Sequence, residues 1–70
     1  MNEGSLRLQK LLEHWIEYND EHILKYREAA NEASKIGAIE TVKEVQNAAE
    51  KGIEVSKHLQ KGLDALKAQK

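Results

Sequence analysis

Apolar side chains recur along the chain at alternating spacings of three and four residues, in two segments separated by Gly37. This heptad spacing places them on one face of a helix and is typical of helices that pack against each other. In the first segment the predicted stripe comprises Leu8, Leu12, Trp15, Asn19, His22, Tyr26, Ala29 and Ala33. In the second segment it comprises Val42, Val45, Ala49, Gly52, Ser56, Leu59, Leu63 and Leu66. The pattern therefore predicts two long helices.

The signals at the predicted helix ends define a hairpin. Pro is absent from the chain, so neither helix is interrupted. Gly37 can adopt the left-handed conformation that ends a helix, and Lys35 suits the helix dipole in the last turn. Ser5 is the predicted N-cap of the first helix, whereas the second helix has no evident side-chain cap. We expect an all-α antiparallel hairpin, one domain over residues 1–70, with helices at about 5–35 and 39–68 and a turn at about 36–38.

The apolar surface is wider than the single seam that two helices can bury. Leu11, Ile16 and Ile23 flank the first stripe, and Ile39, Ala48, Ile53 and Val55 flank the second. A chain of 70 residues with so narrow a core is marginally stable alone, and oligomerisation is the usual remedy. We therefore expect a homodimer that forms an antiparallel four-helix bundle.

Charge favours the pairing of the two segments. Residues 1–34 carry four basic and seven acidic side chains, whereas residues 35–70 carry seven basic and five acidic ones. Antiparallel helices of opposite sign attract each other by a few tenths of a kcal/mol per exposed pair.

Two polar residues, Asn19 and His22, interrupt the first stripe. Polar residues at core positions commonly fix the register and oligomeric state of packed helices at some cost in stability. Glu50 is a candidate hydrogen-bond partner for His22, and large side chains packed over Gly52 explain a glycine inside a helix. The residues expected in the core or the dimer interface are Leu12, Trp15, Asn19, His22, Tyr26, Leu59 and Leu63.

The histidines offer an alternative function. His14, Tyr18 and His22 form a ridge with i, i+4, i+8 spacing, and an acidic ridge lies beside it. Imidazole and carboxylate groups are normal ligands of divalent transition metals such as Zn or Ni. The candidate ligands are His14, His22, Glu17, Glu21 and, across a dimer, His58. The other interpretation of the acidic ridge is a solvated helix face.

The stretch LLEHWIEYNDEHILKYREAANEASKIG resembles a family of short, uncharacterised prokaryotic helical hairpins. Their first helix has the approximate pattern His-Trp-x-x-His-Asn-x-x-His, which His14, Trp15, Asn19 and His22 match. The resemblance implies a helical hairpin, and three histidines at this spacing imply metal binding. Tyr18 stands here where the family has its middle histidine, so this chain has two of the three histidines of the pattern.

Composition excludes several function classes. Without Cys there is no disulfide framework, thiolate metal site or Cys nucleophile. A net charge of −1 and only two Arg argue against nucleic-acid binding, and no apolar run is long enough to span a membrane. No nucleophile–base arrangement or phosphate-binding loop is present. We expect a cytoplasmic, non-enzymatic structural module that self-associates and serves a protein partner, with no cofactor unless a transition metal binds.

Overall fold

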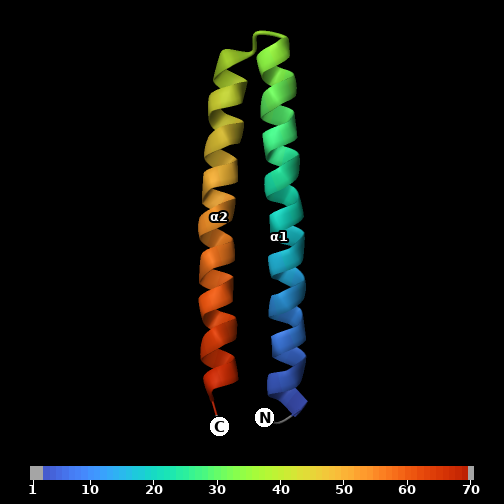
Figure 1. The fold of residues 1–70 in the computed structure, drawn as a ribbon, viewed down its shortest axis with the longest axis vertical. Helices are drawn as coiled ribbons and strands as arrows, with labels where there is room; N and C mark the ends of the chain where they lie inside the picture. The colour runs from blue at the N-terminus through green and yellow to red at the C-terminus, as the bar shows by residue number, and fades with distance from the viewer. Residues whose placement is uncertain (1–2, 70) are drawn as a thin grey trace.

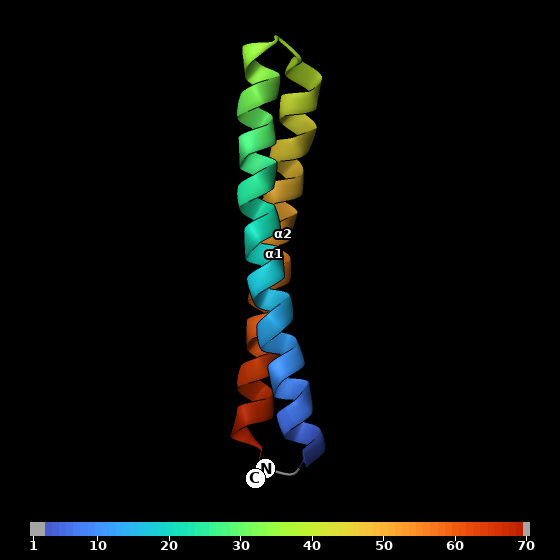
Figure 2. The same cartoon turned by 90° about the vertical axis from the view of Figure 1, so that its right-hand side faces the viewer.

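The computed structural model describes residues 3–69. Helix α1 (Glu3–Lys35) and helix α2 (Ile39–Ala68) lie side by side along their whole length (Figure 1). The hairpin measures 53 × 14 × 10 Å, and α1 begins at the same end at which α2 finishes (Figure 1). Seen from the side, the helices cross at a shallow angle (Figure 2), which is typical of long helices packed through interlocking side chains. The predicted all-α hairpin is confirmed.

The turn follows the C-terminal glycine motif that the sequence indicates. Gly37 has a φ of +75°, in the left-handed region that favours glycine. The amide of Gly37 donates to the carbonyl of Ser34 at 3.1 Å, and the amide of Ala38 donates to the carbonyl of Ala33 at 2.9 Å. These two bonds form a Schellman motif, which satisfies carbonyls at the end of α1.

The starts of the two helices differ in how well they were predicted. Ala38 precedes α2 without a side-chain cap, as expected. The prediction of Ser5 as an N-cap is wrong, because α1 already begins at Glu3 and Ser5 lies inside its first turn.

The face of α2 that packs against α1 is the predicted stripe, whereas the face of α1 is displaced from its prediction by part of a turn. The α1 residues that are buried or half-buried in the seam are Ser5, Gln9, Leu12, Ile16, Asn19, Ile23, Ala30 and Ala33. The prediction is wrong at Leu8, Trp15, His22 and Ala29, each of which lies one residue before a seam position and is exposed. Tyr26 lies at the edge of the seam with 37% of its surface exposed.

The core of the hairpin is thin because the helices pack closely through small side chains. The buried hydrophobic residues of the described chain are Ile23, Ala30, Ala33, Ala49 and Leu63. A Cβ added to Gly52 would lie 2.8 Å from Cγ1 of Ile23, so the glycine is needed for this close approach. The compact Ile23 fits over Gly52 at this separation, and bulkier side chains such as Trp15 lie outside the seam.

Candidate functional site

A polar layer crosses the seam at the middle of the hairpin. The amide nitrogen Nδ2 of Asn19 donates to the carbonyl of Gly52 at 2.7 Å and to Oγ of Ser56 at 2.8 Å. The hydroxyl of Ser56 donates in turn to Oδ1 of Asp20 at 2.7 Å. Asn19 and Ser56 are half-buried, and no buried side-chain nitrogen or oxygen in residues 3–69 lacks a partner. A satisfied polar layer of this kind fixes how far one helix is displaced along the other.

Sequence reasoning identified only part of this layer. The position of Asn19 in the interhelical seam agrees with the prediction, but its partners were missed. Ser56 is a polar residue in the predicted stripe of α2, and this was the signal that could have paired it with Asn19. Asp20 gave no such signal, because its carboxylate reaches Ser56 from an exposed position.

His22 lies outside the seam, which corrects its predicted core position. It is exposed, and its ring lies beside that of Tyr26, with the centroids 6.3 Å apart and the planes tilted by 32°. The expected hydrogen bond to Glu50 is not formed. Glu50 instead lines an open groove on one flank of the hairpin. The place in the seam that was predicted for His22 is taken by the next residue, Ile23, which packs against Gly52.

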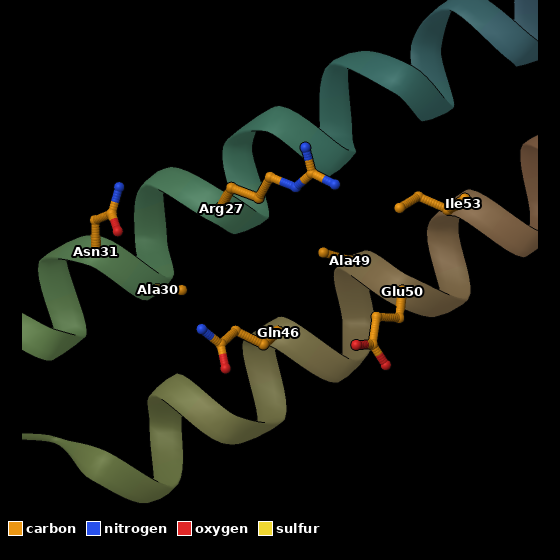
Figure 3. Close-up of a pocket in the computed structure, with 7 residues that line it drawn as sticks. All are labelled: Arg27, Ala30, Asn31, Gln46, Ala49, Glu50 and Ile53. Atoms are coloured by element: carbon orange, nitrogen blue, oxygen red, sulfur yellow. The ribbon is translucent and has the colours of Figure 1, made fainter.

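That groove lies between the two helices and is lined by both of them (Figure 3). Its polar side chains include Arg27, Gln46 and Glu50, and its floor includes Ala30 and Ala49. The carboxylate of Glu50 points away from the guanidinium of Arg27 (Figure 3), and among the ion pairs of residues 3–69 none joins them. The groove therefore offers scattered polar groups and no convergent binding site.

The proposed metal ligands are only partly brought together. His14, Glu17 and Glu21 line one hollow on α1 together with Tyr18, whose ring meets that of His14 edge to face at a centroid distance of 4.2 Å. His22 and His58 do not line this hollow. Within residues 3–69 of one copy, no group of three or more His, Asp or Glu residues is arranged to hold a metal ion.

A second apolar stripe runs along the outside of α1. We call it the outer stripe; it consists of Leu8, Leu11, Trp15, Tyr18 and His22. The four largest apolar members are each between 40% and 50% exposed. Their spacing of three and four residues is the same heptad spacing that forms the seam with α2. Helix α1 thus has two faces with heptad spacing, of which one packs against α2 and the other is exposed.

Comparison with protein families places the chain. A family model described as "Domain of unknown function (DUF8180)" matches residues 8–66, which include the turn and nearly all of both helices. The chain belongs to this family. Neither the curated proteins nor the solved structures give a match. The predicted resemblance to an uncharacterised family is thus confirmed, and for this DUF8180 domain the fold is a two-helix hairpin. In the described part of the domain, no helix is sufficiently long and apolar to cross a membrane.

Proposed function

We propose that this DUF8180 domain is a non-enzymatic self-association module, whose hairpins pair through the outer stripe to form a four-helix bundle. The observation that carries the proposal is the exposure of this stripe, at the centre of which Trp15 is 47% exposed. Apolar side chains with regular heptad spacing and no partner are characteristic of helix-packing faces.

The surface area of the hairpin supports the same proposal. Its accessible surface is 5547 Å². A folded monomer of its 8.0 kDa mass is expected to expose about 4,450 Å². The excess of about 1,100 Å² is similar to the roughly 800 Å² that each partner buries in a stable interface. A second copy placed on the outer stripe would bring the exposed area per chain close to that of a compact protein.

Sedimentation velocity over a wide range of concentrations tests this proposal. We expect a reversible monomer–dimer equilibrium, in which Trp15→Gln raises the dimer dissociation constant at least ten-fold. The matched control is Leu24→Gln, because Leu24 is a large apolar residue that is 59% exposed but lies outside the outer stripe. Equal effects of the two substitutions, or a monomer at all concentrations, would contradict the proposal; a monomer would point to a different protein as the partner.

The alternative function is a metal-binding accessory protein. It is supported by the hollow that His14, Glu17 and Glu21 share on α1. Because one copy arranges no group of three ligands, the metal would need ligands from a second copy, such as His22 or His58. Calorimetric titration with Zn²⁺ tests this alternative, which requires micromolar affinity in the wild type, a loss in His14→Ala, and a parallel loss in the Trp15→Gln variant.

A further inference from the structure

Small residues lie along α2 on the same side of the hairpin as the outer stripe. We call them the small-residue flank; they are Ala48, Val55, Gly62 and Ala65, all exposed and all smaller than the large members of the outer stripe, with Lys51 and His58 between them on the same side. Ala48, Val55 and Gly62 each precede a seam residue, as Trp15 and His22 do on α1. In antiparallel helices such equivalent positions lie on one side of the pair. The groove lined by Arg27, Gln46 and Ile53 occupies the other side.

The heights of the large and small residues match along the hairpin. The bond from Asn19 to Ser56 shows that these two residues lie at the same height along the hairpin. The height of any other residue follows from the helical rise of about 1.5 Å per residue. By this register Tyr18 lies close to the height of Val55, and Trp15 close to the height of Gly62. Leu11 lies at a height between Gly62 and Ala65. Tyr18, Trp15 and Leu11 therefore each have a small residue within two positions of their own height on the other helix. His58 lies at a height between those of Tyr18 and Trp15.

Gly62 has no role within the hairpin that explains it. A Cβ added there would meet nothing within 4 Å, so the intramolecular packing does not require a glycine. Glycine inside an exposed helix costs about 1 kcal/mol relative to alanine. Space above Gly62 is useful only to a group that comes from outside the chain.

We propose that two copies face each other with their turns at the same end, so that each outer stripe packs on the small-residue flank of the partner's α2. This arrangement rests on the self-association proposed above. A two-fold axis along the hairpin keeps every residue at its own height, so large residues of one copy meet small residues of the other. All neighbouring helices are then antiparallel, as in an up-down-up-down bundle.

Packing distinguishes this arrangement from the one with turns at opposite ends. With turns at opposite ends, the outer stripes of the two copies would contact each other, large side chain against large, and the two small-residue flanks would face each other across the space beside Gly62. With turns at the same end, large side chains of each copy fill that space on the other.

A spin-label distance decides between the two arrangements. The chain has no native Cys, so Ile36→Cys gives one labelling site at the turn, where the side chain is 81% exposed. Turns at the same end predict a label–label distance below about 30 Å, because helices in a bundle lie about 10 Å apart. In a dimer with turns at opposite ends, the distance approaches or exceeds the 53 Å length of the hairpin. A long label–label distance overturns the arrangement but not self-association. If both the labelled variant and the wild-type protein are monomeric, self-association is overturned as well.

A paired substitution tests the contact at Gly62. We expect Gly62→Gln to weaken the dimer at least ten-fold while leaving the helicity of the monomer unchanged or higher. The control, Asp64→Gln, places the same side chain two residues later, about 200° around the helix and away from the small-residue flank. Unaltered dimerisation of Gly62→Gln, or an equal loss in both variants, overturns the proposed contact.

Discussion

The side chain of Ile23 occupies the space that a Cβ on Gly52 would enter, with Cγ1 only 2.8 Å from that position. The contact sets the distance between the helices at the middle of the hairpin, where the carbonyl of Gly52 also accepts a hydrogen bond from Asn19. A close approach and a polar layer thus act on the same segment: the first fixes the spacing of the helices and the second fixes their register.

Substitution of Gly52 by Ala should therefore destabilise the hairpin. Helix propensity alone would stabilise it by about 1 kcal/mol. Overpacking against Ile23 should cost about 1–3 kcal/mol, so we expect a net loss of stability. Thermal unfolding followed by circular dichroism measures the effect. In an Ile23→Ala background the crowding is removed, and Gly52→Ala should become neutral or stabilising; the same loss in both backgrounds would show that Ile23 is not the cause.

The two cross-helix bonds of Asn19 predict different outcomes for two substitutions. Asn19→Ala removes both cross-helix bonds and should destabilise the hairpin by about 1–2 kcal/mol. Asn19→Leu should recover stability through apolar burial but loosen the register, which a polar layer specifies. Chemical denaturation gives the stabilities, and a mixture of species in sedimentation reveals the loss of specificity. Asn47→Ala, at an exposed position of α2, serves as a control and should change stability by less than about 0.5 kcal/mol.

The turn predicts a third effect, at Gly37. Its φ of +75° is unfavourable for any residue with a Cβ, so Gly37→Ala should cost about 1–2 kcal/mol. Asn tolerates the left-handed conformation better, and Gly37→Asn should cost less than Gly37→Ala. Denaturant midpoints of the two variants give the order. The reverse order would mean that the Schellman motif does not limit the stability of the hairpin.

The sequence was sufficient to predict the hairpin because long heptad stripes, a lone Gly37 and the absence of Pro leave few other folds. It was also sufficient to predict the packing face of α2, where one apolar stripe competes with no other. Helix α1 was harder, because Trp15 and Ile16 are adjacent and both fit a heptad stripe. The close approach at Gly52 suits Ile23, and with Ile23 in the seam the helix period places Ile16 there as well and leaves Trp15 and His22 outside.

The same ambiguity affected the candidate site. Heptad spacing identifies the residues of α1 that are suited to pack, but not which partner each stripe takes. The hydrogen bonds between Asn19, Ser56 and Asp20 depend on the register of the two helices, which periodicity within each helix does not determine. Placing His22 on the seam followed directly from choosing the wrong one of two neighbouring stripes.

The tryptophan provides a direct measure of which face of α1 becomes buried. Trp15 is the single Trp of the chain and is 47% exposed in the hairpin, so its emission in the monomer should be that of a partly hydrated indole. If the outer stripe forms the dimer interface, raising the concentration should move the emission maximum to shorter wavelength as the indole leaves water. The midpoint of this shift should coincide with the dissociation constant from sedimentation, because both report one equilibrium. In Gly62→Gln the midpoint should move to higher concentration, whereas in Asp64→Gln it should stay in place. Constant emission through a range in which sedimentation shows dimers would place Trp15 outside the interface and assign self-association to another face of the hairpin.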